Sequence, residues 1–150
     1  MDSDFILQYC IDNYEGIVLC NSYGERCIFY NPDMSLKRGV YVLTVKDKDG
    51  ECDKSSALGR QGVYRVNLGI SGDTFTKMFG AKPSRPAKGG IVDMPYDFSA
   101  LDTVMPHPVY AWMNWICVLN PSDNTFLHLL PLIDEAYSLA RAKCGKRMRT

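Results

Sequence analysis

The sequence predicts an α+β fold, in which a twisted, mainly antiparallel sheet of about five strands carries the N- and C-terminal helices on one face. Segments with apolar residues at helical spacing occupy both ends of the chain. Short segments rich in β-branched and aromatic residues lie between them, separated by turn residues. The 150 residues contain neither an internal repeat nor a linker-like stretch, so we expect one domain over residues 1–150.

The first part of the chain is predicted to form one helix and three strands. Residues 4–14 have the helical spacing, and acidic and serine residues near their start are suited to cap a helix. Residues 17–21 and 26–30 are predicted to pair as a hairpin, with Gly24 in the turn. Residues 39–46 are rich in β-branched and aromatic side chains, which predicts the third strand.

A fourth strand is predicted over residues 63–70, where polar and apolar side chains alternate. Arg65 and Asn67 fall on its polar face. Such a face usually meets solvent, and this is the preferred interpretation. The alternative is a polar cleft wall, with both side chains pointing at a ligand or at a carboxylate from a neighbouring loop. Residues 47–61, which precede this strand, are expected to be a solvated surface loop.

Further elements are predicted between this strand and the fifth. Ser71 is suited to cap a short helix over residues 72–79. Residues 80–95 are rich in proline and glycine, and we prefer a plain surface loop to a flap over a site. One helical turn is expected within residues 99–104. The fifth strand, residues 112–119, is apolar on both faces, as is typical of a central strand covered on both sides.

A long helix is predicted to follow Ser122, which is suited to cap it. Pro131 lies inside this helix and is expected to kink it or to divide it into two segments. The basic end of the chain, residues 144–150, is predicted to be a mobile tail.

Composition narrows the range of functions. Basic and acidic residues balance at 17 each, so the whole molecule has no strong field to attract nucleic acid or acidic lipid. No apolar run is long enough to cross a membrane, and the acidic start is unlike a signal peptide, so we expect a cytoplasmic protein. The six cysteines form no C-x-x-C pair, which favours reduced, structural thiols over zinc ribbons or redox sites.

The segment most indicative of a site is residues 105–121. His107 lies between Pro106 and Pro108, which stiffen the backbone, so the imidazole is expected to be held out on a segment that loses little entropy on binding. Aromatic side chains, Tyr110 and Trp112 among them, follow and offer flat contact surface. The segment is therefore suited to recognising a small ligand or a peptide, although a histidine that only locks an irregular loop has the same pattern.

An enzyme is the alternative, with His107 as general acid or base and Asp102 or Asp97 orienting its ring. Cys117 is a poor nucleophile candidate because it lies in the most apolar strand. No nucleophile elbow, metal-binding histidine pattern or phosphate loop is present, so we expect no metal and no cofactor.

We therefore predict a binding module for a small ligand or peptide, acting as a monomer or homodimer. The enzyme is the second hypothesis. DNA binding is the third, and would require the basic residues of the 80–95 loop and of the tail to lie on one face. The candidate ligand-binding residues are His107, Tyr110, Trp112, Arg65, Asn67 and Asp102.

Four stretches resemble a bacterial family known only as a domain of unknown function. They are residues 62–70, 100–102, 105–111 and 115–121, of which His-Pro-Val-Tyr and Val-Leu-Asn-Pro are the most specific parts. The end of the chain, from Trp115 onward, also resembles the MmcQ/YjbR group, apart from Pro131. That resemblance implies an α+β fold like that of the frataxin-type CyaY proteins and a link to DNA binding. Neither resemblance implies a reaction or a catalytic residue.

Overall fold

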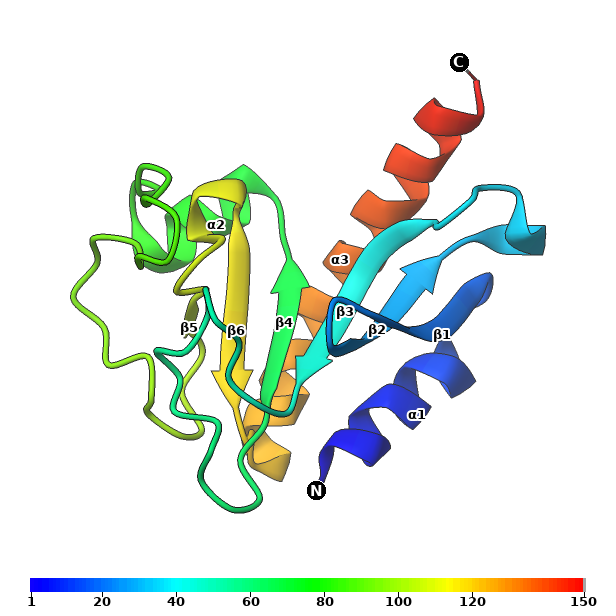
Figure 1. The fold of residues 1–150 in the computed structure, drawn as a ribbon. Helices are drawn as coiled ribbons and strands as arrows, with labels where there is room; N and C mark the ends of the chain where they lie inside the picture. Colours follow the sequence, from blue (N-terminus) through cyan, green and yellow to red (C-terminus); the bar gives the residue numbers. More distant parts are fainter. Residues whose placement is uncertain (150) are drawn as a thin grey trace.

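The computed structural model describes residues 1–149 and contains three α-helices, two short 3-10 helices and six strands (Figure 1). In chain order the elements are α1 (Ser3–Asn13), β1 (Ile17–Ser22), β2 (Glu25–Tyr30), η1 (Pro32–Met34), β3 (Val40–Lys46), β4 (Arg65–Gly69), α2 (Gly72–Phe79), β5 (Met105–Pro106), η2 (Ala111–Met113), β6 (Trp115–Leu119) and α3 (Asp123–Met148). The predicted α+β class is confirmed.

The six strands form one antiparallel sheet in the order β1-β2-β3-β4-β6-β5. Cross-strand register places Val45, Val66 and Val118 in one row on the same face. These side chains are buried in the core together with residues of α1 and α3. The two terminal helices also touch each other, since the rings of Phe5 and Phe126 meet edge to face. The terminal helices therefore share one face of the sheet.

The other face is covered by irregular chain. Figure 1 shows the connection between β3 and β4 crossing in front of the sheet, while α3 passes behind it. The long connection from α2 to β6 lies beside the edge of the sheet formed by β6 and β5 (Figure 1). Within it, a hydrogen bond from Val92 N to Pro108 O at 2.8 Å joins the loop to the segment that follows β5. The face predicted to be polar on β4 is thus enclosed by loops and is not open to solvent.

Several local predictions are corrected here. The helical turn expected within residues 99–104 is absent, because Asp102 adopts a positive φ of 54° and its N–H pairs with Leu119 O. The fifth predicted strand begins at Trp115, because Asn114 is in the left-handed region with a φ of 67°. One strand, β5, was not predicted. It has only two residues, too few to show a strand pattern in the sequence.

Of the two alternatives predicted for the last helix, a kink or a division, the division is wrong, because α3 runs from Asp123 to Met148 with Pro131 inside it. Pro131 is exposed, while Leu129 and Ile133 on either side are fully buried. Packing of that buried stripe outweighs the one hydrogen bond that a proline removes. The basic segment predicted as a mobile tail continues the helix as far as Met148, and Cys144 is buried. None of the helices within residues 1–149 is long and apolar enough to cross a bilayer.

Replacing Pro131 with alanine is expected to raise the free energy of unfolding by about 2 kcal/mol. This is the cost of a proline inside a helix, about 3 kcal/mol, less the entropy that proline removes from the unfolded chain. Urea unfolding measures the change. Pro95→Ala, at an exposed position outside the helices, is the control and should not stabilise the protein. An unchanged or lower stability of Pro131→Ala would show that the helix has adapted its geometry to the ring.

Candidate functional site

A buried polar cluster lies on the loop-covered face of the sheet, with Arg65 at its centre. The Arg65 side chain is fully buried. Its Nε donates to Asn67 Oδ1 at 2.6 Å, and its two terminal nitrogens donate to the Asp53 carboxylate at 2.9 and 2.5 Å. Nη1 also donates to Ser56 Oγ at 2.9 Å, and Nη2 faces His107 Nε2 at 3.2 Å. Four of the five N–H groups of the guanidinium therefore have an oxygen acceptor, and the fifth faces the His107 ring.

This arrangement decides between the two interpretations of the polar face of β4. The solvent-facing interpretation is wrong, and the carboxylate from a neighbouring loop is Asp53. The expectation of a solvated loop over residues 47–61 is also corrected, since Ser56 and Leu58 are buried. The bidentate pair fastens this loop to the sheet. Burial alone would raise the pKa of Asp53, but the hydrogen bonds and charge of Arg65 outweigh it and hold that pKa below its usual value.

From Asn67 the polar cluster continues across the sheet. Asn67 stands opposite Thr44 on β3, and its Nδ2 donates to Thr44 Oγ1 at 3.0 Å. Glu25 of β2 accepts from both, through Oε1, at 2.9 Å from Thr44 and 3.2 Å from Asn67. Cross-strand register thus connects three side chains that are far apart in sequence.

His107 is held at the other end of the cluster, only 2% exposed. Its Nδ1 accepts from the backbone N–H groups of Val109 and Tyr110, each at 3.0 Å, and its Nε2 faces Arg65. A neutral imidazole has a single acceptor nitrogen, and a second proton would remove that acceptor and place a cation beside Arg65. Burial and the charge of Arg65 accordingly hold the pKa of His107 well below its usual value.

The cluster opens into a cavity of about 340 Å³, here called the polar pocket. Its volume lies within the usual range for small-ligand sites. The lining residues are Ser22, Tyr23, Glu25, Cys27, Arg38, Tyr41, Thr44, Asn67, His107, Tyr110, Met113 and Trp115. Three sequence-predicted residues, His107, Tyr110 and Asn67, are therefore brought together here.

Three other predicted residues lie outside the lining of this pocket. Arg65 lies beneath it and acts through Asn67 and His107. Asp102 lies at the start of α3, where its carboxylate accepts from the N–H of Ser122, the N-cap residue, at 2.7 Å. Trp112 bonds Val109 O and lies under the Arg85 guanidinium.

Neither proposed orienting carboxylate hydrogen-bonds His107 among the described residues. Asp102 accepts from the backbone N–H of Ser122, and Asp97 accepts from the backbone N–H and the hydroxyl of Ser99. The carboxylate whose charge acts on His107 is Asp53, which is also bonded to Arg65. Cys117 lies on the same face and is inert, because burial raises the pKa of its thiol to about 12.

Sequence reasoning missed Glu25, Thr44 and Tyr41 as lining residues. A partial signal was present, because Thr44 and Lys46 alternate with apolar neighbours on β3, just as Arg65 and Asn67 do on β4. Glu25 gave no signal of its own, since it begins a strand directly after the hairpin turn. Only the register of the sheet shows that these positions share one wall.

The pocket combines fixed hydrogen-bonding groups with aromatic surface. Glu25 supplies a carboxylate on one wall, and the half-exposed Tyr110 supplies a hydroxyl at the rim. Burial, followed by the carboxylates of Asp53 and Glu25, raises the pKa of Tyr110, so its hydroxyl stays protonated near neutral pH. Tyr41 and Trp115 meet edge to face, with their ring centres 6.3 Å apart. Such a site is suited to holding a planar, polar molecule.

Comparisons with curated proteins and with solved structures found no similar chain. The resemblance to MmcQ/YjbR and CyaY proteins therefore stays a prediction. A family model, described as a family of unknown function (DUF6194), matches residues 1–149. The match covers the helices, the sheet and the polar pocket alike. The chain therefore belongs to family DUF6194, a family of unknown function.

Proposed function

We propose that this protein binds a small polar ligand in the polar pocket. The observation that carries the proposal is the polar wall of Asn67, Thr44 and Glu25, in which Asn67 and Thr44 are buried and Glu25 is half-buried, and which lines a cavity. Buried polar groups are costly, and they are retained where they fix a ligand's orientation. The cavity of about 340 Å³ has the size of a small-molecule site, which favours a small ligand over a peptide.

Binding receives more support than catalysis. A general base needs a lone pair directed at the proton it removes. Both ring nitrogens of His107 already face N–H groups, two from the backbone at Nδ1 and one from Arg65 at Nε2. The ring is therefore better suited to holding Tyr110 at the pocket rim than to exchanging protons with a substrate. Arg65, which does not line the pocket, donates a hydrogen bond to Asn67 and so holds this side chain of the polar wall in position.

Cytoplasmic location and a monomeric or homodimeric state belong to the same proposal. All six cysteines are free thiols, and four of them are buried. Unpaired thiols in this number are typical of proteins from a reducing compartment.

The test is a fragment screen followed by amide chemical shifts in ¹H–¹⁵N NMR spectra. Compounds with N–H donors on a planar ring are expected to shift amides of β2, β3 and residues 107–115. Glu25→Gln removes the carboxylate charge and should weaken such a hit by about tenfold or more, as expected for a charge-assisted hydrogen bond. Tyr110→Phe should weaken it about threefold, as expected for one neutral hydrogen bond.

Tyr9→Phe, which removes a hydroxyl from the α1–α3 aromatic contacts, is the matched control and should leave the affinity unchanged. All variants are first compared by thermal unfolding, so that loss of binding is separated from loss of fold. Hits that cluster away from the polar pocket, or that bind Glu25→Gln and wild type equally, would contradict the proposal.

A further inference from the structure

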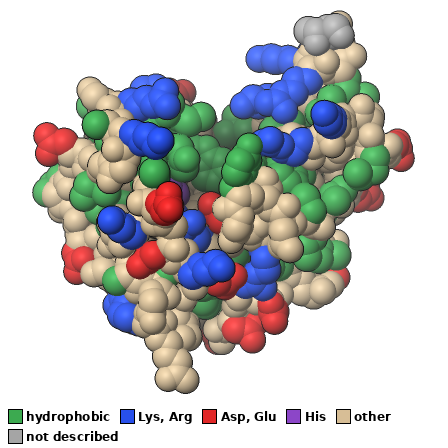
Figure 2. All heavy atoms as spheres, in the orientation of Figure 1, with side chains coloured by type: hydrophobic (Ala, Val, Ile, Leu, Met, Phe, Trp, Pro, Cys, Tyr) green, Lys and Arg blue, Asp and Glu red, His purple; other side chains and the backbone are tan. Residues whose placement is uncertain are grey.

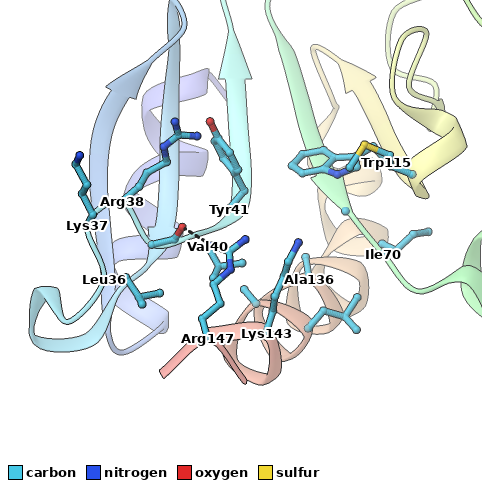
Figure 3. A pocket seen from close by; sticks show the side chains of 15 residues that line it. Leu36, Lys37, Arg38, Val40, Tyr41, Ile70, Trp115, Ala136, Lys143 and Arg147 are labelled. Atoms are coloured by element: carbon cyan, nitrogen blue, oxygen red, sulfur yellow. Dashed lines mark hydrogen bonds between the residues drawn. The ribbon is translucent and has the colours of Figure 1, made fainter. Parts of the chain in front are cut away.

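A second cavity, of about 500 Å³, adjoins the polar pocket and is here called the basic cleft. It lies between the start of β3, the end of β4 and the last turns of α3. Figure 2 shows a hollow with hydrophobic walls at this place, with Lys and Arg side chains gathered on both sides of it. Figure 3 shows four basic side chains around the cleft: Lys37, Arg38, Lys143 and Arg147. No aspartate or glutamate of the described residues lines it.

The segments that carry the basic side chains are held by the fold around them. Asn31, only 2% exposed, bonds both the N–H and the C=O of Leu36, each at 2.8 Å, which fixes the segment that carries Lys37 and Arg38. From the other side, Arg147 Nη1 donates to Gly39 O at 3.3 Å. The positive charges therefore converge from two segments onto one concave surface.

The cleft gathers positive charge from two segments of the chain. Lys143 and Arg147 are four residues apart on one helix, a spacing at which like charges repel. Lys37 and Arg38 add two more cations from the facing segment (Figure 3). A concave, partly apolar surface strengthens the field of such a group and raises the local concentration of anions. Basic side chains gathered in this way suit the negative charge and the several acceptor oxygens of a phosphate.

The basic cleft and the polar pocket are continuous. Four residues, Arg38, Tyr41, Met113 and Trp115, line both cavities. The Trp115 indole lies against Gly69, where an added Cβ would come within 3.2 Å of the ring. The missing side chain at Gly69 thus gives the indole its place at the junction. Together with Tyr41, it forms an aromatic surface between a hydrogen-bonding end and a cationic end.

We propose that the ligand is a phosphate-bearing small molecule with a planar, hydrogen-bonding group, the chemistry of a nucleoside phosphate. The phosphate lies in the basic cleft, the planar group contacts Trp115 and Tyr41, and its polar edge faces Glu25 and Asn67. The assignment of the planar end rests on the proposed function of the polar pocket. The assignment of the phosphate end rests on the basic cleft alone.

Tryptophan fluorescence can report binding directly. Trp112→Phe leaves Trp115 as the single tryptophan, since the chain has two and Trp112 lies outside both cavities. This variant is titrated with the four common ribonucleoside 5′-monophosphates, with the matching nucleosides and with inorganic phosphate. At least one monophosphate is expected to change the emission and to bind at least tenfold more tightly than its nucleoside.

Charge variants identify the phosphate end. The double variant Lys37→Gln/Lys143→Gln changes two exposed lysines of the cleft and should weaken the monophosphate about tenfold, while affinity for the nucleoside stays the same. Lys82→Gln/Lys146→Gln removes the same charge from exposed lysines outside the cleft and should have little effect. Higher salt should weaken the monophosphate and leave the nucleoside unaffected.

The outcomes separate this inference from the proposed function. A monophosphate and its nucleoside that bind equally, with no effect of the cleft lysines, would overturn the phosphate site and leave the polar pocket as proposed. The absence of binding by all four monophosphates would overturn the nucleoside phosphate assignment, whatever the fragment screen finds. Binding of a DNA oligonucleotide without binding of any monophosphate would also overturn it, and would indicate a nucleic-acid surface.

Discussion

Replacing Arg65 with methionine is expected to lower the free energy of unfolding by about 3–5 kcal/mol, as is typical when one partner of a buried ion pair is removed. Methionine matches much of the side-chain length but leaves the Asp53 carboxylate without its bidentate partner. Asn67 Oδ1 and Ser56 Oγ lose their donors as well. Urea unfolding followed by circular dichroism measures the change.

Arg26→Met is the matched control. Arg26 also contacts two carboxylates, those of Asp4 and Asp47, but these are 83% and 51% exposed. Water and salt screen such pairs, so the loss should be about 1 kcal/mol or less. Burial of the pair, and not the number of contacts, accounts for the difference between the two variants. Equal losses for the two arginines would contradict this account.

A double variant tests the coupling to Asp53. Arg65→Met/Asp53→Leu removes both charges together, so neither remains buried alone. It should be more stable than the sum of the two single losses predicts. Additive losses would show that the two side chains act independently, against the bonded geometry at 2.9 and 2.5 Å.

Stability is also expected to decline as the pH falls below about 6.5, the usual pKa of an unfolded histidine. The pKa of His107 in the fold is held well below that value by burial and by Arg65, with Lys46 acting in the same direction and Asp53 opposing. At pH values between the folded and the unfolded pKa of His107, the unfolded chain binds a proton that the folded chain does not bind. The free energy of unfolding therefore falls by up to about 1.4 kcal/mol per pH unit, and is unaffected by this group above pH 6.5.

Two histidine variants isolate the effect. His107→Gln removes the titrating ring, so its stability should change less than that of wild type between pH 6.5 and 5. His128→Gln, at an exposed position on α3, serves as the matched control and should keep the wild-type slope. The two variants also assign the imidazole signals in an NMR titration. A His107 ring that takes up a proton near pH 6.5 would contradict the buried, donor-faced environment.

Asp53 acts in a lower pH range. Its pKa in the fold is below its usual value, so its contribution is complete above about pH 3.9, the unfolded reference, and is lost as the pH falls through the folded value. The contribution of Asp53 therefore begins to be lost only below about pH 4, whereas that of His107 begins to be lost near pH 6.5. Loss of stability that begins near pH 6.5 is therefore attributable to the histidine. Below about pH 4 the Arg65–Asp53 pair contributes together with Asp97 and Asp102, whose pKa values are also held below the usual value.

Local patterns predicted much of the fold. Ser71 caps α2 as its position before residues 72–79 indicates, and its Oγ accepts from Thr74 N at 3.1 Å. The alternation on β4 placed Arg65 and Asn67 together on one face, where the structure has them. These features follow from capping and from side-chain periods, which act over a few residues. The resemblance of the chain to a family of unknown function is likewise confirmed by the family match.

What the sequence alone determined is therefore the α+β class, most element bounds and the stiff placement of His107. Tertiary structure alone decided that Asp53, and not Asp97 or Asp102, acts on the cluster, and that Glu25 and Thr44 share a wall with Asn67. It also decided that α3 continues through Pro131 and that Lys37 and Lys143 line the same cleft. The reason is that cross-strand register, loop closure and helix docking join residues far apart in the chain, and the energy of those contacts appears in no local pattern.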